Sequence, residues 1–516
     1  MKSNSLVLNL VLILVLGLVS FSVYFNSLHG EFLIDDQTGI LNNKNIHNLG
    51  KYFSQHFSLR PGILNETTKA LLWHISGGKT FVFHLFNVFV HAGCVILIFV
   101  LLSLLFKNRM LSFLSSLIFA VHPIHTEAIS WISGGPYAYA GLFFLASFIF
   151  YIKSNKSIAN LILCIIFFGL CLFTGNIVAV LPLAMIAYEL FFREQDEAGN
   201  KFLSRMRIAV LLAIFSISLL IVAMFFVTRN QFMHTIYYFR GNTYLIVAAK
   251  AFVYYLKIIY LPLARGLYHP FAYNTTDTNK VTPALFISIA AISILIFAFI
   301  KCLKNHKPIS FGIAWFFITY LPYSNIIPVC NIISERYVYL PSLGFCIILA
   351  YLALKAWEII NKNTQYRKFL RIISVTVIAL FLISYASLTV KHNRDYRDII
   401  TYWHTNINNF PDGYMAYNNL AGTYYVMGEI EQAKAYSWVT LMINPEQPHV
   451  WSNLGMVYRN SGDIKMAKFC YGEALKLDSG FNPAIKALEE IKQQEEKEAG
   501  APAKKEKKRH LRKGSN

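Results

Sequence analysis

Long apolar runs alternate with short polar connectors along the first 390 residues of the chain. Eleven of these runs are long enough for an α-helix to cross a bilayer. A further segment, residues 243–264, is amphipathic and interrupted by Pro262, which predicts a helix lying along the membrane interface. The eleven predicted spans cover residues 5–25, 82–106, 110–131, 137–153, 157–173, 177–192, 208–228, 282–300, 309–325, 340–358 and 370–390.

The composition agrees with a multi-pass membrane protein. Of the 516 residues, 55% are hydrophobic and only 14% are charged, against about 25% charged in a soluble domain. The net charge of +20 does not indicate nucleic-acid binding, because many of the Lys and Arg residues lie in short connectors between apolar runs. Seven cysteines, an odd number, argue against a disulfide framework.

The distribution of Lys and Arg predicts the orientation in the membrane. With a cytoplasmic N-terminus, one set of alternate loops carries clusters of Lys and Arg, whereas the short loops of the other set, near 132–136 and 174–176, carry none, as the positive-inside rule predicts. Residues 5–25 lack a small-residue cleavage site, so we interpret them as an uncleaved first helix rather than a signal peptide. The polar segment after this helix and everything beyond residue 391 are then extracytoplasmic, in a periplasm or an endoplasmic reticulum lumen.

After residue 391 the chain becomes polar and repetitive. The stretch WSNLGMVY at 451–458 has the residue spacing of a tetratricopeptide repeat, and Tyr417, Leu420 and Tyr424 stand 34 residues before its equivalent positions. We predict a transmembrane domain at 1–390, a linker helix at 391–413, repeats at 414–447 and 448–481 with a capping helix to 496, and a basic disordered tail at 497–516.

Unusual polar residues gather on the predicted extracytoplasmic side. Ionisable groups beside membrane spans are costly and therefore mark candidate functional sites. Structural alternatives remain open: Asp36 has the chemistry of a helix cap, His122 and His125 could be satisfied at a helix end, and Glu335 could pair with Arg336. The two histidines lack a clear third zinc ligand, and the sequence does not decide whether a divalent metal takes part. The candidates are Asp35, Asp36, Arg60, His122, His125, Glu127, Glu335 and Arg336.

These residues lie in motifs that resemble those of the transmembrane and tetratricopeptide-repeat O-mannosyltransferase family, in the GT-C glycosyltransferase superfamily. The resemblance covers nearly the whole chain and rests on the order of its motifs. They read FLIDDQTGILNN, RPG at 60–62, FHLFNVFVHA at 83–92, VHPIHTEAISWISG, ERYVYLPSLGF and NRDYRD at 393–398. The resemblance implies an all-α, GT-C-like bundle of about eleven membrane helices, followed by the repeats.

It also implies transfer of a sugar from a polyprenyl-phosphate donor to a Ser or Thr hydroxyl of a protein that the repeats bind. An acid of the first extracytoplasmic loop is the expected base. Sequence reasoning favours Asp36, with Asp35 orienting it or a metal. Arg336, with Glu335 and Arg60, is expected at the lipid phosphate, and His122, His125 and Glu127 at sugar or acceptor.

The chain departs from the family pattern in two places. An Arg and an acidic residue usually follow the WISG segment, where this chain has Gly135 and Tyr137. A Ser-Lys-Glu motif is replaced by Thr174, Gly175 and Asn176. These lost charges keep open an alternative function, a non-catalytic membrane scaffold whose repeats bind an envelope or secretory protein.

Overall fold

The computed structural model describes residues 2–192, 201–236, 243–262, 283–326, 333–362 and 366–499. Within these ranges every regular element is a helix, so the fold class is all-α, as the sequence predicts. The basic tail lies outside the described residues from position 500 onward. The chain divides into two compact units, Met1–Tyr402 and Trp403–Asn516.

In the described part of the first unit, seven helices are long and apolar enough to cross a membrane, as expected of an integral membrane protein. Apolar residues are distributed around the whole circumference of each helix, which suits a helix that faces lipid on one side and other helices on the other. They are α1 (Lys2–Tyr24), α5 (Thr80–Phe106), α8 (Pro136–Lys153), α11 (Lys201–Ile236), α14 (Pro283–Cys302), α16 (Ser342–Lys362) and α17 (Arg367–Asn393).

The other four predicted spans form helices that are shorter than expected, so their length alone does not support the predicted number of eleven crossings. The amphipathic segment forms α12 (Thr243–Tyr260), which ends just before Pro262 and buries Phe252 and Tyr255 in the core of the bundle. The four short helices are α6 (Arg109–Val121), α9 (Ile158–Leu172), α10 (Leu181–Phe192) and α15 (Lys307–Tyr320).

The predicted span at 110–131 is wrong at its C-terminal end. Helix α6 stops at Val121, and His122 adopts an extended conformation. The cause is Pro123, because a residue before proline is pushed out of the helical region. The chain continues as η4 (Pro123–His125), α7 (Thr126–Ser130) and η5 (Ile132–Gly134). This broken segment, rather than a continuous helix, carries the HPIHTEAISW motif.

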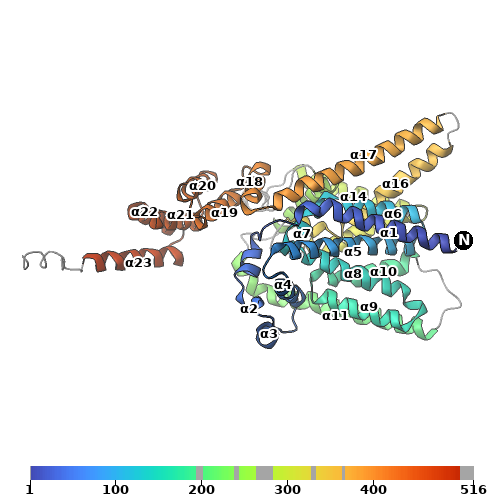
Figure 1. Ribbon diagram of the computed structural model, residues 1–516, viewed down its shortest axis with the longest axis horizontal. Helices are drawn as coiled ribbons and strands as arrows, with labels where there is room; N and C mark the ends of the chain where they lie inside the picture. The colour runs from blue at the N-terminus through green and yellow to red at the C-terminus, as the bar shows by residue number, and fades with distance from the viewer. Residues whose placement is uncertain are drawn as a thin grey trace, which may run out of the picture. The chain divides into compact units, whose positions relative to one another are not determined.

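Neighbouring helices of the bundle lie side by side, as Figure 1 shows for α1, α5, α8 and α9. One close crossing joins α15 and α16. A Cβ atom added to Gly312 would stand 2.7 Å from the carbonyl oxygen of Gly344, and one added to Gly344 only 2.2 Å from that of Gly312. Only glycine permits this approach of the two backbones.

The first loop folds into a small layer of short helices with its own core. Ile40, Ile46, Tyr52 and Ile63 are buried there against Phe83 of α5. This core holds the loop firmly at one end of the bundle. The layer consists of η2 (Gln37–Leu41), α2 (Lys44–His47), α3 (Leu49–Lys51), η3 (Tyr52–His56) and α4 (Ile63–Ser76).

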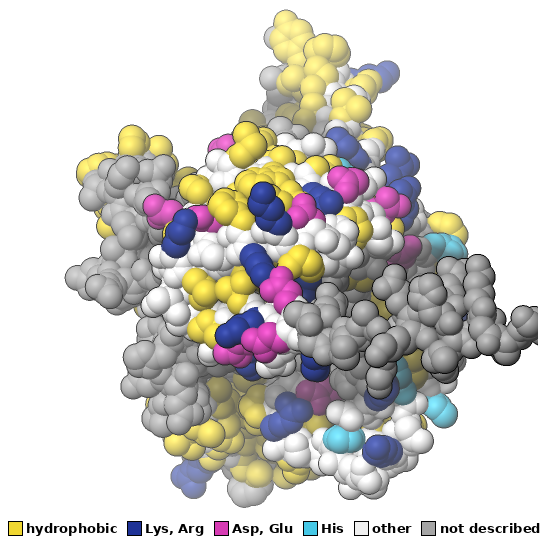
Figure 2. All heavy atoms as spheres, turned by 90° about the vertical axis from the view of Figure 1, so that its left-hand side faces the viewer, with side chains coloured by type: hydrophobic (Ala, Val, Ile, Leu, Met, Phe, Trp, Pro, Cys, Tyr) yellow, Lys and Arg dark blue, Asp and Glu magenta, His cyan; other side chains and the backbone are white. Residues whose placement is uncertain are grey.

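The second unit is built from antiparallel helix pairs. Small residues such as Ala433, Gly455 and Ala467 allow the helices of each pair to pack closely. On the face of the molecule drawn in Figure 2, acidic and basic side chains are mixed. The last helix is tied to its neighbours by the ion pairs Arg459–Glu490 and Lys468–Glu495. The helices are α18 (Ile399–Asn409), which spans the boundary between the units, α19 (Tyr414–Val426), α20 (Ile430–Ile443), α21 (Pro448–Asn460), α22 (Ile464–Leu477) and α23 (Asn482–Ala499).

Candidate functional site

The two adjacent acids of the first loop have different environments. The side chain of Asp36 is fully buried, whereas Asp35 is exposed. They follow Ile34, which has a φ of 45°. A positive φ in a β-branched residue is strained by about 1–3 kcal/mol and needs surrounding structure to hold it. The backbone before the acid pair is therefore fixed by its contacts rather than by its own preference.

The Asp36 carboxylate supplies those contacts. Its Oδ2 accepts a hydrogen bond from the Leu33 N–H at 3.0 Å. Its Oδ1 accepts from the Ser133 N–H at 2.8 Å and from the Ser133 hydroxyl. Asp36 stands before η2, but its side chain makes no capping bond to that helix. Asp36 thus joins the first loop to the broken segment after α6.

Burial raises the pKa of Asp36 from 3.8 to about 6, because an ionised carboxylate loses its hydration there. The hydrogen bonds from Ser133 and Leu33 and the charge of Lys69 oppose this rise without cancelling it. Lys69 lies on α4, and its ammonium donates to the Ser133 hydroxyl oxygen at 3.3 Å. The Lys69 ammonium is therefore linked to the Asp36 carboxylate through a single serine.

The second charged centre is an ion pair between Glu127 of α7 and Arg336 of η10 (Glu335–Val338), both buried. Glu127 also accepts from the Arg336 backbone N–H at 3.0 Å and from the Ser334 hydroxyl at 2.8 Å. Ser334 is held in turn by the Tyr255 hydroxyl, which accepts from its N–H at 2.9 Å. Contacts from Glu127 and from Tyr255 therefore hold the chain segment that carries Arg336 in place.

Aromatic rings surround the Arg336 guanidinium. Its central carbon lies 5.1 Å from the ring centre of Trp131 and 5.4 Å from those of Tyr137 and Tyr337. Rings at this distance attract a cation through their electron-rich faces. Tyr137, where the resemblance implies an acidic residue, therefore contacts Arg336 without carrying a negative charge.

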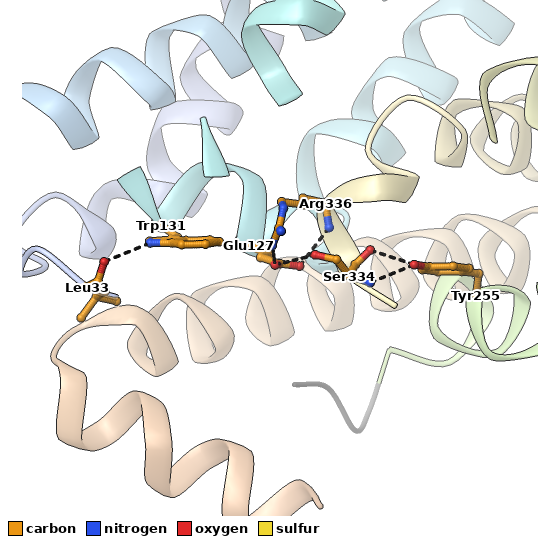
Figure 3. Close-up of polar contacts among 6 residues, drawn as sticks. All are labelled: Leu33, Glu127, Trp131, Tyr255, Ser334 and Arg336. Carbon is orange, nitrogen blue, oxygen red and sulfur yellow. Dashed lines mark hydrogen bonds and ion pairs between the residues drawn. The ribbon is translucent and has the colours of Figure 1, made fainter. Parts of the chain in front are cut away.

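Trp131 connects the two charged centres. Its indole N–H donates to the Leu33 carbonyl oxygen at 3.4 Å, while its ring faces Arg336. Figure 3 shows the Leu33–Trp131 hydrogen bond on one side and, on the other, the polar contacts that join Glu127, Arg336, Ser334 and Tyr255; the Trp131 ring lies against Arg336 between them. Because Leu33 also donates to Asp36, the acid pair and the arginine belong to one connected site.

The backbone between Glu127 and Ser133 closes tightly on itself. A Cβ atom added to Gly134 would stand 2.1 Å from the Glu127 carbonyl oxygen, and one added to Gly135 would stand 2.4 Å from the Asn87 side-chain oxygen. Neither position accepts a side chain unless the neighbouring atoms move. A side chain at Gly135 would therefore require the Asn87 and Tyr139 side chains to move.

The structure does not bring every predicted site residue to this centre. Both ring nitrogens of His122 bond to backbone: Nδ1 accepts from the Ile124 N–H and Nε2 donates to the Ile259 carbonyl, each at 3.1 Å. His125 bonds to the Ser342 hydroxyl at 2.8 Å and lies against Phe119. These contacts favour the structural alternative for both histidines.

Two further predicted residues differ sharply in exposure. Arg60 is paired on the surface with Glu66 at 2.7 Å, with half of its side chain exposed. Glu335 is buried next to Arg336 in the chain, but the ion pair of Arg336 is with Glu127 instead of Glu335. Arg336 thus pairs with an acid more than 200 residues away in the sequence, whereas the sequence suggested its neighbour Glu335 as an alternative partner.

Sequence reasoning missed four residues that build the site: Lys69, Ser133, Ser334 and Tyr255. Ser133 stands inside the WISG motif and Ser334 directly precedes the ERYVYLPSLGF motif, so the motifs pointed to the right segments without giving the hydroxyls a role. Lys69 and Tyr255 lie on helices with no motif, and no pattern in the sequence distinguishes them. Among the residues that the structure describes, no group of three or more His, Cys, Asp or Glu side chains is arranged to hold a metal ion.

Comparison with known proteins finds similarities that include both parts of the chain. Residues 448–481 match the family model described as tetratricopeptide repeat. Human protein O-mannosyl-transferase TMTC3 is 24% identical over 530 residues, covering 92% of this chain and 56% of the relative. A Caenorhabditis elegans protein O-mannosyl-transferase, F38B6.6, is 24% identical over 90% of this chain and 62% of its own length.

A shorter region is more similar still. Human protein O-mannosyl-transferase TMTC4 is 34% identical in an alignment of length 180 that covers 28% of this chain and 24% of the relative. The chain spans little more than half the length of the first relatives it matches. Together with the motifs and the repeat match, these similarities confirm the resemblance: the chain is a relative of the transmembrane and tetratricopeptide-repeat O-mannosyltransferases.

Proposed function

We propose that the chain is a GT-C-type membrane glycosyltransferase that moves a sugar from a polyprenyl-phosphate donor to a protein Ser or Thr hydroxyl on the extracytoplasmic face. The observation that carries this proposal is the continuous line of contacts from Asp36 through Leu33 and Trp131 to Arg336. It supports an acid and a cation acting on one substrate. The names of the relatives make mannose the first sugar to test.

The reaction needs a base at the acceptor hydroxyl. As the hydroxyl oxygen forms a bond to the anomeric carbon, its proton passes to a carboxylate, and a base must touch the proton that it removes. Asp36 is fully buried and already accepts three hydrogen bonds, whereas Asp35 is exposed. We therefore assign the base to Asp35 and a positioning role to Asp36, which reverses the assignment drawn from the sequence.

The reaction also needs a cation at the leaving group. When the bond between the anomeric carbon and the phosphate oxygen breaks, its electron pair stays on the lipid phosphate, which gains negative charge. Arg336 suits this role because a guanidinium offers several N–H donors in one plane. Glu127 and the rings of Trp131 and Tyr137 hold that plane in a fixed orientation.

The repeats and the charge asymmetry supply the remaining parts of the proposal. Stacked helix pairs form an extended surface suited to a peptide or a protein segment, so we assign acceptor binding to α19–α22. The excess of Lys and Arg in one set of connectors supports a cytoplasmic position for those connectors. The site and the repeats are then extracytoplasmic, where a lipid-linked donor and a secreted acceptor would meet.

The test is sugar transfer by the purified full chain in detergent, from polyprenyl-phosphate mannose to a Ser/Thr-containing acceptor peptide. Asp35→Asn should lower the rate by about two to four orders of magnitude, the usual contribution of a positioned base. Asp412→Asn, an exposed carboxyl outside the bundle, is the matched control and should leave transfer intact. Full activity of Asp35→Asn would overturn the assignment.

A membrane scaffold without catalysis is the second candidate. It is favoured by the burial of Asp36 and by the pairing of Arg336 with Glu127, which leave both charges partnered within the chain. On this reading the folded chain binds a protein through its repeats, and no lipid-linked sugar serves as a donor. Wild-type protein that binds an acceptor but transfers no sugar from any polyprenyl-phosphate donor would support the scaffold.

A further inference from the structure

One partly buried charge near the acid pair has no place in the function proposed so far. Lys69 extends from α4 toward the broken segment, and its ammonium donates to the Ser133 hydroxyl oxygen at 3.3 Å. That hydroxyl donates its own proton to Asp36 Oδ1. The three groups therefore form a directed chain, in which an ammonium donates to a hydroxyl and the hydroxyl donates to a carboxylate.

The surroundings of Lys69 do not fit an ordinary surface lysine. On the exposed side of α4 an acid three residues away would be its natural partner, but that acid, Glu66, binds Arg60 at 2.7 Å instead. A Cβ atom added to Gly39 would lie only 3.2 Å from the Lys69 ammonium, so η2 covers the group closely. The lysine thus points into the site rather than along the helix surface.

The charges that act on these groups come from few elements. Burial lowers the pKa of Lys69, and the acids Asp36, Asp35 and Glu66 oppose that change. Lys69 is the cation whose charge acts on Asp36. From α8, the Tyr139 hydroxyl is close enough to respond to the charge of Asp36. Lys69 is therefore placed to lower the pKa of the buried carboxyl, together with the hydrogen bonds from Ser133 and Leu33.

We propose that Lys69 is a positioning residue, which keeps the Asp36 carboxyl ionised through Ser133 so that it holds the first loop and Trp131 in place. The ionised form matters because a protonated carboxyl has turned one acceptor site into a donor. The N–H groups of Leu33 and Ser133 would then compete for fewer acceptor sites. The backbone at Ile34, with its φ of 45°, would lose part of what fixes it.

The first test measures the protonation of Asp36 without relying on catalysis. The melting temperature of the full chain in detergent is followed from pH 4.5 to 8 for each variant and for the same variant combined with Asp36→Asn. The difference between the two curves reports the titration of Asp36. Removing an opposite charge at this separation shifts a carboxyl pKa upward by about one unit or more.

Lys69→Met removes the charge and keeps the length of the side chain, and should move the Asp36 titration up by about one pH unit. Lys69→Arg should restore it, and Ser133→Ala, which removes the hydroxyl from the chain of donors, should shift it in the same direction as Lys69→Met. Lys51→Met, which removes an exposed lysine from the same loop, is the control and should change nothing. An unshifted titration in Lys69→Met would overturn the proposal, as would the same pH-dependent change in the Asp36→Asn background.

The second test uses activity and rests on the proposed function. In Lys69→Met, the acidic limb of the pH–rate profile should move to higher pH by the same amount, and transfer should recover in alkaline buffer. A variant with a merely structural defect would lose rate equally at every pH, which would count against the proposal. If the wild type transfers no sugar while the melting curves shift as expected, the enzyme assignment fails and the role of Lys69 stands.

Discussion

Replacing Asp36 with Asn should remove a pH dependence of stability that its buried carboxyl creates. Folding raises the pKa of this group from 3.8 to about 6. The folded chain therefore binds the proton more tightly than the unfolded chain does. The stabilisation from this group is fully present below about pH 4 and is lost as the pH rises through about 6.

The size of the effect follows from the shift. A difference of about two pKa units, at about 1.4 kcal/mol per unit, corresponds to about 3 kcal/mol between the protonated and ionised forms. Asn has the same shape and does not titrate. The wild type should thus gain stability over Asp36→Asn as the pH falls from 7 to 4.5, and other titrating groups cancel in the comparison.

The assay is thermal unfolding in detergent, followed by tryptophan fluorescence at one fixed scan rate, because a large membrane protein need not unfold reversibly. Asp35→Asn, one residue away and exposed, controls for the loss of a charge from this loop. A wild-type-minus-variant difference that stays constant from pH 4.5 to 7.5 would refute the reasoning, since the carboxyl would then not change its protonation in that range.

Three further predictions concern topology, the repeats and the arginine. Reporter fusions at residues 200 and 450 should lie on opposite sides of the membrane, with residue 450 extracytoplasmic; reporters on the same side would exclude the proposed geometry. Deleting residues 414–490 should abolish transfer to a protein acceptor but spare donor binding, and normal protein glycosylation by the deleted chain would give the repeats another role. Arg336→Lys should lower transfer by about tenfold or more, since losing one hydrogen bond to a charged group costs about 1.5–3 kcal/mol; an unchanged rate would show that charge alone suffices.

The helices could be predicted from the sequence because hydropathy is a local property. The seven longest apolar helices fall on predicted spans. The end of α6 was also encoded locally, in Pro123, but the apolar residues beyond it extended the predicted span to residue 131. Whether the four short helices cross the membrane could not be predicted from hydropathy, because a run of apolar residues does not distinguish a crossing helix from a buried one.

The site could be predicted only in part, because its contacts join distant segments. Asp36 and Ser133 are 97 residues apart, and Glu127 and Arg336 are 209 apart. The motifs identified the segments that meet. They did not separate Asp35 from Asp36, since exposure is a property of the fold, and they gave His122 a candidate role that its two backbone bonds make unnecessary.

The tight backbone closure between Glu127 and Ser133 sets a fixed spacing in the site. Because Gly134 leaves no room for a side chain against the Glu127 carbonyl oxygen, the separation of the acid pair from the arginine is determined by main chain and by the number of residues. Substitutions along this segment can alter the environment of each charged group without changing the distance between the acid pair and the arginine. Insertion or deletion of a single residue would instead shift one half of the site relative to the other. A redesign of this site must therefore preserve the length of the segment more than its exact composition.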